Sequence, residues 1–381
     1  MCGVKGKFTF HRAGHGLFYS GVIKSEDLKE EFNFVYDCGT MPQRRKEFDF
    51  DAQIDAYKKT IDNKLDMLVI SHFHEDHVNG LEKLLNRGVT PKLVIMPYVS
   101  DSERATIIFS KKIKEKFLLE FYEDPVGWFV HRGVKKIILI RKKHGDEPGE
   151  MVLQDDMSGT LISRKQVKET SIITMAGKVE LLIPEFRWIF EFESVDFEST
   201  EEYEKKLEKF MRGKSIKELL EENKLKLLRK EFGKEKLGKD YNNLTSVMMM
   251  HGPENERVKK EQKPQNERVK KTQEQEFKRQ SYSLLMGDAK IARKKVDMFE
   301  SYKKGLCYIC QYPHHGGNGC GIRKIKKFAT SYVICFCDGT GRPSEKVKKG
   351  LSGKIIEVTE MKPKKPGTDG FIYEIPRRVH R

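Results

Sequence analysis

The segment LVISHFHEDHVNGL, residues 68–81, concentrates metal-ligating side chains directly after an apolar run. It contains the pattern H-x-H-x-D-H, formed by His72, His74, Asp76 and His77. Imidazole nitrogens and carboxylate oxygens are the ligands that hold zinc and similar divalent ions in proteins. Side chains two positions apart point the same way in an extended segment, so His72 and His74 would face one ion. Asp76 and His77, at the start of a following helix, would face a second.

Two distant segments place further ligand-type residues where strands end. The run SLLMGDAK ends in Asp288, and CYICQYPHHGGNG ends in the pair His314 and His315. Strand ends are where open α/β sheets build their sites. We therefore expect Asp288 to bridge two metal ions and one histidine of the pair to be a ligand. The sequence leaves open which histidine it is.

Four further residues are candidates for supporting roles. Asp37 ends the strand-like run FNFVYDCGT, and we expect it to orient a ligand histidine, as metal sites require; a turn-forming Asp-Cys-Gly is the alternative. His15 lies in a Gly-His-Gly turn. Asn242 and Asn243 either line the pocket or are ordinary turn residues.

The elements around these residues predict sheets covered by helices. In the first half of the chain we expect strands over 5–12, 16–24, 32–40, 65–72, 91–98 and 134–143, and helices over 50–62, 80–88 and 102–121. A hairpin bent around Pro184 is expected over 178–194, and strands are expected over 244–252, 282–288, 332–339, 354–360 and 370–376. Alternation of strands and helices, together with hairpins, implies layered sheets in one domain over 1–381.

Two segments differ in composition from this framework. Residues 199–240 are rich in Glu, Lys and Leu and predict amphipathic helices broken near Gly213, which we interpret as an inserted helical cover. Residues 253–280 contain the hexapeptide NERVKK twice and predict a charged, flexible hairpin loop. That loop is either a solvated insertion or a nucleic-acid contact.

The charge of the chain favours an anionic partner. The formal net charge is +16, and residues 321–381 alone contain 15 Lys or Arg against 6 Asp or Glu. Such a balance is typical of proteins that bind nucleic acid or nucleotides, although a lysine-rich solvated surface would give the same numbers. The sequence contains no run of ~20 apolar residues and no signal-peptide pattern. We therefore expect a cytoplasmic protein without a membrane partner; its oligomeric state is not indicated.

The seven cysteines do not predict a disulfide framework, because their number is odd and the chain is long. Cys307 and Cys310 form an isolated C-x-x-C within an apolar run, without a second pair at zinc spacing. We interpret both as buried strand residues.

Taken together, these motifs resemble the metallo-β-lactamase-fold hydrolases. Asp37, the H-x-H-x-D-H pattern, Asp288 and the paired histidines occur in that family's order, and GHG, NNLTSV, GDA and HHGG look most similar to the metal-binding domain of the DNA-uptake protein ComEC and its soluble relatives. The resemblance implies a four-layer αββα sandwich, here with a helical insertion, that holds one or two Zn²⁺ ions or alternatively Mn²⁺. The chain departs from the family in one respect, because His131, His144 and His251 all lack the context of its further ligand histidine.

The same resemblance implies a metal-dependent hydrolase. We expect a phosphodiesterase or nuclease that attacks through a metal-bound hydroxide, with Asp76 orienting the water and His15 or the second histidine of the pair protonating the leaving oxygen. An ester, lactone or thioester hydrolase would use the same site. A non-catalytic, partner-binding protein with an incomplete site is the other alternative.

Overall fold

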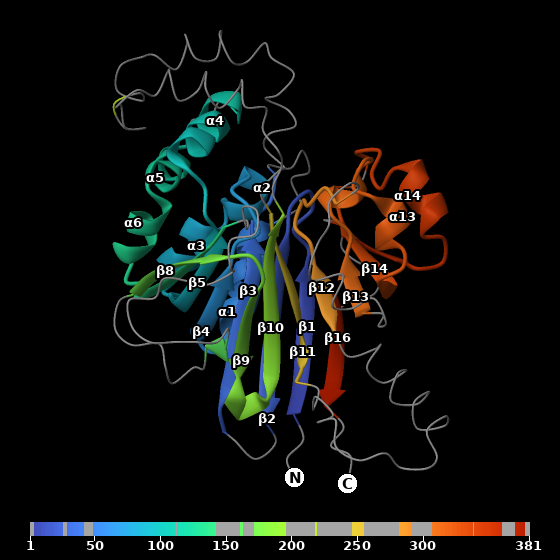
Figure 1. Ribbon diagram of the computed structural model, residues 1–381, viewed down its shortest axis with the longest axis horizontal. Coiled ribbons are helices and arrows are strands. Elements are labelled where there is room, and N and C mark those ends of the chain that lie inside the picture. Colours follow the sequence, from blue (N-terminus) through green and yellow to red (C-terminus); the bar gives the residue numbers. More distant parts are fainter. Residues whose placement is uncertain are drawn as a thin grey trace.

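Two mixed β-sheets form the centre of the molecule (Figure 1). The computed structural model describes residues 4–25, 29–41, 49–111, 113, 115–141, 161–162, 171–195, 218, 246–254, 282–291, 307–337, 339–359 and 370–377. The first sheet has the order β16 (Gly370–Arg377), β1 (Val4–His11), β2 (Phe18–Ser25), β3 (Glu31–Cys38), β4 (Leu65–Val69), β5 (Pro91–Pro97), β6 (Lys136–Arg141) and β8 (Ser171–Ala176). The second has the order β15 (Ile355–Val358), β14 (Ala329–Cys335), β13 (Cys307–Gln311), β12 (Ser283–Leu285), β11 (Ser246–Pro253), β10 (Trp188–Val195), β9 (Val179–Ile183) and β7 (Leu161–Ile162).

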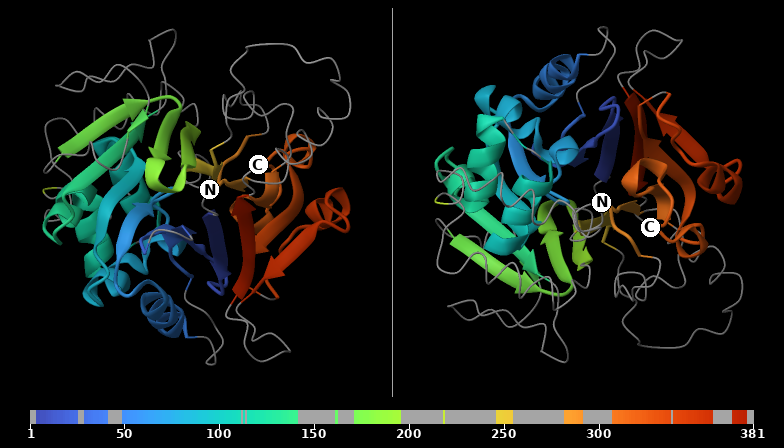
Figure 2. Two further views of the ribbon diagram at one scale, coloured as in Figure 1. Left: turned by 90° about the horizontal axis from the view of Figure 1, so that it is seen from below. Right: turned by 90° about the horizontal axis from the view of Figure 1, so that it is seen from above.

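Helices cover the outer face of each sheet. Those of the first half are α1 (Phe50–Ile61), α2 (Glu75–Val78), α3 (Leu81–Asn86), α4 (Asp101–Lys111), α5 (Lys116–Glu123) and α6 (Pro125–Val130). The second half contributes α13 (Ile322–Ile325), α14 (Glu345–Gly350) and the 3₁₀ turn η3 (His314–Gly316), and a further 3₁₀ turn, η1 (Pro184–Phe186), joins β9 to β10. The end-on views show the helices on opposite sides of the two sheets (Figure 2).

Three hydrophobic clusters fill the spaces between these layers. One lies between the first sheet and helices α1 and α3–α6, one between the two sheets, and one between the second sheet and α13 and α14. In α1, Phe50, Ile54, Tyr57 and Ile61 are buried at helical spacing, and the Asp49 carboxylate caps the helix by accepting from the Ala52 N–H. The expected four-layer αββα sandwich is confirmed.

Parallel strand pairs bring the candidate site residues to one end of the sandwich. Strand β3 is parallel to β4, and β13 is parallel to both β12 and β14. The chain leaves these strands toward the same end of the molecule, at the top of Figure 1, where α2 lies; η3 directly follows β13. The five residues of β4 are all buried, as expected for a strand covered on both faces.

The structure corrects one expected element and adds a strand. The single helix predicted over 102–121 is two helices, α4 and α5, and buried Ile113 lies in the break between them. Strand β8 was not anticipated. Of the helical cover predicted over 199–240 only Glu218 is described, and the loop predicted over 253–280 lies outside the described residues beyond Glu254.

Cys307 and Cys310 are both buried, as predicted. Each lies near a methionine, with Cys307 Sγ 4.0 Å from Met250 Sδ and Cys310 Sγ 3.7 Å from Met286 Sδ. Burial raises the pKa of Cys307 to about 12 and that of Cys310 well above its usual value. Neither thiol is therefore a reactive thiolate at neutral pH.

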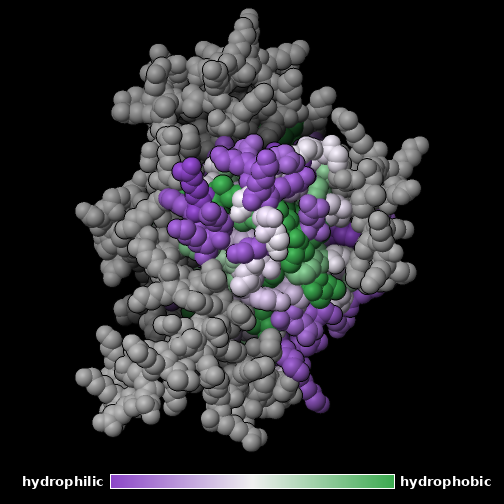
Figure 3. Space-filling model, turned by 90° about the vertical axis from the view of Figure 1, so that its right-hand side faces the viewer, coloured by the Kyte–Doolittle hydropathy of each residue, from purple (hydrophilic) through white to green (hydrophobic). Residues whose placement is uncertain are grey.

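The side of the second sheet mixes apolar and polar surface (Figure 3). Tyr308 of β13 and Ile372 of β16 are among the exposed large apolar side chains of the described residues, and the Tyr308 ring centroid lies 6.0 Å from that of Tyr373. Within the described part of the chain, no helix is both long and apolar enough to span a bilayer.

Candidate metal centre

The H-x-H-x-D-H segment follows β4 and enters the short helix α2. Two glycines from other parts of the chain, Gly16 and Gly39, pack against its backbone. A Cβ on Gly39 would lie 2.5 Å from the backbone of Asp76 and His77, and one on Gly16 would lie 2.8 Å from the Asp76 carbonyl oxygen. The glycines of Asp-Cys-Gly and Gly-His-Gly therefore let the chain approach the ligand segment closely. His72, His74, Asp76 and His77 are all buried there.

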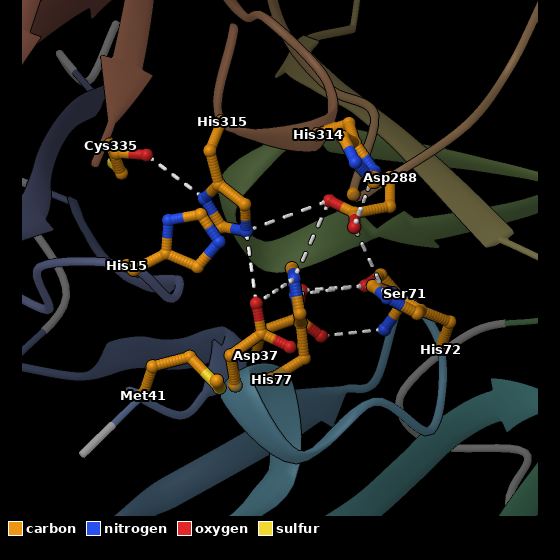
Figure 4. Close-up of polar contacts among 12 residues, drawn as sticks. His15, Asp37, Met41, Ser71, His72, His77, Asp288, His314, His315 and Cys335 are labelled. Carbon is orange, nitrogen blue, oxygen red and sulfur yellow. Dashed lines mark hydrogen bonds and ion pairs between the residues drawn. The ribbon is translucent and has the colours of Figure 1, made fainter. Parts of the chain in front are cut away.

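Asp37, at the end of β3, binds this segment through its carboxylate (Figure 4). Its Oδ1 accepts from the Ser71 N–H at 2.6 Å, and its Oδ2 accepts from the Ser71 hydroxyl at 2.6 Å. The same Oδ2 lies 2.8 Å from His77 Nδ1. Ser71 Oγ in turn lies 2.8 Å from His72 Nδ1. One buried carboxylate therefore orients His77 directly and His72 through a hydroxyl.

These contacts determine which nitrogen of each histidine is available for a ligand. The Ser71 hydroxyl has a single proton and gives it to Asp37, so Ser71 Oγ accepts from His72 Nδ1–H. His77 donates Nδ1–H to Asp37, and His315 donates Nδ1–H to the Cys335 carbonyl oxygen at 2.9 Å. With Nδ1 engaged in all three rings, Nε2 is the atom left to bind a metal.

Asp288 lies between the two halves of the cluster. Its Oδ2 is 3.7 Å from His72 Nε2, whereas its Oδ1 is 3.5 Å from His77 Nε2 and 3.9 Å from His315 Nε2. Asp76 Oδ2 is 3.0 Å from His315 Nε2 and 3.8 Å from His77 Nε2. The two oxygens of one carboxylate thus face two different sets of histidines, as a bridging ligand requires.

The donor atoms form three overlapping groups that could each hold an ion. Within each group the ligand atoms lie within 4.8 Å of one another. The first group is His72, His74 and Asp288; the second is His77, Asp288 and His315; the third is His15, Asp76 and His315. His72 Nε2, His77 Nε2 and Asp288 Oδ1 are buried without a hydrogen-bond partner in the described structure. Buried polar atoms in this state are costly unless something satisfies them. A divalent cation fits this donor set.

Charge and burial set the protonation of the cluster. Burial lowers the pKa of His72, and neighbouring His77 and His74 lower it further. Burial also lowers the pKa of His77, but the carboxylates of Asp76, Asp37 and Asp288 outweigh it and hold that pKa well above the usual value. Binding of a cation at His77 Nε2 would therefore displace a proton.

The carboxyl groups respond to the same environment. Burial raises the pKa of Asp37, and hydrogen bonds from His77 and Ser71 only partly oppose it. Burial also acts to raise the pKa values of Asp76 and Asp288, but nearby histidines, His77 first, hold both well below their usual range. Asp76 and Asp288 are thus ionised and able to bind a cation.

The paired histidines have different surroundings. His315 Nε2 faces Asp76 and Asp288, and His315 belongs to two of the three groups. His314 Nδ1 instead lies 3.0 Å from Asp288 Oδ2, and its Nε2 lies 3.3 Å from Arg342 Nη2. An arginine only donates, so His314 Nε2 accepts and Nδ1–H donates to Asp288. His314 thus orients the Asp288 carboxylate with both ring nitrogens engaged.

Three non-glycine residues of the cluster have left-handed backbone conformations. The φ angles are 57° at Asp37, 54° at His314 and 50° at His315. Such conformations are uncommon outside glycine and concentrate at functional sites. Gly287, with φ 52°, precedes Asp288, and a Cβ there would lie 2.7 Å from Ser71 Cβ.

The candidates for a further ligand histidine lie elsewhere or are not described. His251 is in the core between the sheets, where its Nε2 lies 2.8 Å from Tyr19 Oη. His131 is exposed at the end of α6. His144, Asn242 and Asn243 lie outside the described residues.

His15 is in the cluster, with its ring centroid 4.1 Å from that of His315. Burial, followed by the nearby charges of His315 and Arg342, lowers its pKa to about 3. At neutral pH His15 is therefore uncharged, and its expected role as proton donor stays a prediction.

Sequence reasoning missed Ser71 and Arg342. The serine directly precedes the H-x-H-x-D-H pattern, so its position was a usable signal. Arg342 comes from the loop after β14, and only the fold brings it to His314.

Residues 19–162 match the sequence model of the Metallo-beta-lactamase superfamily. The metallo-beta-lactamase fold protein YhfI from Bacillus subtilis aligns with 12% identity over 97% of this chain and 99% of that chain, with a TM-score of 0.37. A diphosphatase from the PhnP family aligns with 10% identity over 97% of each chain, and yeast PDE1 with 9% identity over 93% and 97%, each with a TM-score of 0.37. No curated protein matches the sequence.

Proposed function

We propose that this chain, which has the metallo-β-lactamase fold, is a metal-dependent hydrolase that cleaves phosphodiester bonds of nucleic acid or nucleotides. The observation that supports it best is the convergence of His72, His77 and His315, through Nε2, on the carboxylate of Asp288. In all three histidines Nδ1–H donates to a protein acceptor, which leaves Nε2 free of a proton to bind a metal.

Two ion sites would share Asp288. His72, His74 and Asp288 would hold one ion, and Asp76, His77, His315 and Asp288 the other. Imidazole and carboxylate ligands suit zinc, and manganese is the alternative. Bound ions would stabilise charge on phosphoryl oxygens and lower the pKa of a water molecule at the site.

The protein's own groups have separate tasks in this proposal. Asp76 is ionised and would accept a hydrogen bond from the attacking water, thereby orienting it. Asp37 is a positioning residue, since it reaches the site only through Ser71 and His77. His315 acts as a ligand, because Nδ1 is engaged by Cys335 and Nε2 faces Asp76.

The choice of a phosphodiester rests on charge and on motif resemblance. The net charge of +16 favours an anionic substrate. The motifs GHG, GDA and HHGG, similar to those of the ComEC metal-binding domain, favour nucleic acid or nucleotides within that class. An ester, lactone or thioester substrate would use the same ion sites but would not need the positive charge.

Paired substrates separate these possibilities. The metal-free protein is supplied with zinc or manganese and tested on bis-p-nitrophenyl phosphate and on p-nitrophenyl acetate. We expect metal-dependent cleavage of the phosphodiester, abolished in Asp288→Ala. Cleavage of the acetate alone would replace the proposal with carboxylic-ester hydrolysis.

A further inference from the structure

Arg342 lies beside the candidate metal centre in the loop between β14 and α14. Its Nη1 donates to the His314 carbonyl oxygen at 2.7 Å, and its Nη2 donates to His314 Nε2. The other nitrogen of that imidazole contacts Asp288 at 3.0 Å. The guanidinium group is thus separated from the bridging carboxylate by one histidine ring.

The loop that carries Arg342 is fixed to the turn that carries His315. Ser344 N–H donates to the Gly316 carbonyl oxygen at 3.0 Å, and the Ser344 hydroxyl donates to Asn318 Oδ1 at 2.8 Å. A Cβ on Gly316 would lie 2.5 Å from Pro343 Cβ. This close packing positions the loop beside the paired histidines, where the two hydrogen bonds to His314 hold the guanidinium group.

The charge of Arg342 is not neutralised by a carboxylate within the described part of the chain. Its contacts with His314 use two of the five N–H groups of a guanidinium. The side chain is half-buried, so it retains access to solvent. Its charge also acts on His15, whose ring packs on His315. A positive charge therefore remains available on the side of the site formed by His15, His314 and His315.

We propose that Arg342 binds a non-bridging phosphate oxygen of the substrate, which makes the site selective for phosphate esters over neutral esters. Guanidinium groups match the geometry and charge of phosphate and are more weakly hydrated than ammonium groups. A neutral ester or thioester offers no negative oxygen in this position and would gain nothing from the contact. This inference rests on the proposed function, because it assigns the substrate class of the same site.

The test measures binding of thymidine 5′-monophosphate to the metal-loaded protein by calorimetry, and turnover of bis-p-nitrophenyl phosphate in parallel. Arg342→Gln removes the charge and keeps an N–H donor, on a shorter side chain. We expect the metal content to stay unchanged and nucleotide affinity to fall about 10- to 100-fold, as for loss of a charge-assisted hydrogen bond. Arg342→Lys, which keeps the charge, should lose less.

Arg323→Ala is the control for net charge, because Arg323 is exposed on α13. It should bind the nucleotide as the wild type does. Wild-type affinity in metal-loaded Arg342→Gln, or an equal loss in Arg323→Ala, would overturn the inference. Failure of the proposed function gives a different result, in which the nucleotide binds in an Arg342-dependent manner but the phosphodiester is not cleaved.

Discussion

Asp37 holds Ser71 by two hydrogen bonds of 2.6 Å, one to the backbone N–H and one to the hydroxyl. This pair fixes the start of the ligand segment at the end of β4. It also determines the tautomer of His72, because a hydroxyl that donates to Asp37 can only accept from His72 Nδ1. His77 obtains its orientation from the same carboxylate. One carboxylate, that of Asp37, therefore supports both proposed ion sites.

Asp37→Asn should weaken metal binding at both sites. The amide nitrogen in place of Oδ2 would present a donor to His77 Nδ1 and favour the tautomer with a proton on Nε2, which cannot bind an ion. Loss of such a supporting contact typically lowers metal affinity about 10- to 100-fold. Competition with a chromophoric chelator measures the affinity. Asp66→Asn, which removes another buried strand carboxylate that accepts from Asn33 N–H, should leave it unchanged.

Ser71→Ala should affect the two sites unequally. It removes the acceptor for His72 Nδ1, whereas His77 keeps its contact with Asp37. Stepwise titration of the metal-free protein with Co²⁺, followed by absorption, should show one weakened and one nearly unchanged site. Ser20→Ala is the matched control, because it removes a buried hydroxyl 2.7 Å from His11 Nε2. Equal weakening of both sites by Ser71→Ala would contradict the assignment.

Gly287→Ala should be more damaging than Gly88→Ala, although both residues have positive φ. The values are 52° and 80°, so each alanine incurs the backbone cost of a left-handed conformation, about 1 kcal/mol. Only at Gly287 would the added Cβ collide, at 2.7 Å from Ser71 Cβ; none of the described atoms lies within 4 Å of that position at Gly88. Chemical denaturation and metal content measure both effects. Retention of full metal binding by Gly287→Ala would show that the contact is not needed.

The folded protein should lose stability as the pH falls from about 6.5 toward 3. Burial lowers the pKa values of His11 and His251 to about 3 in the folded state, so between these limits the unfolded chain binds more protons. Each histidine should cost about 2 kcal/mol between pH 7 and pH 5. Denaturant unfolding of the metal-free wild type and of His251→Phe measures the difference. The variant should show a smaller loss on acidification by about that amount; an identical loss would mean that His251 is not buried as a neutral ring.

Much of the framework could be predicted because local patterns determine it. The alternating and continuous apolar runs predicted β1–β5, and helical spacing predicted α1. The long helix predicted over 102–121 was wrong because Ile113 is buried in a break that amphipathic spacing does not reveal. Segment boundaries of this kind depend on tertiary packing rather than on local propensity.

In the candidate site, too, some features follow from local sequence and others depend on tertiary structure. Residue type and spacing were enough to single out Asp37, the H-x-H-x-D-H pattern, Asp288 and the paired histidines. His314 and His315 have different surroundings because both have left-handed backbone conformations. Two consecutive histidines in a sequence do not indicate these conformations. Arg342 depends on the pairing of β13 with β14 and on the packing of Pro343 against Gly316, which no local pattern records.

The most direct test of this account is the number of divalent ions that the purified protein binds. Elemental analysis after dialysis against zinc or manganese, with the protein concentration measured by amino-acid analysis, gives this number. Two sites that share Asp288 predict close to two equivalents in the wild type, and a loss from both sites in Asp288→Ala. Fewer than about half an equivalent after supplementation would contradict the metal centre and favour a non-catalytic protein.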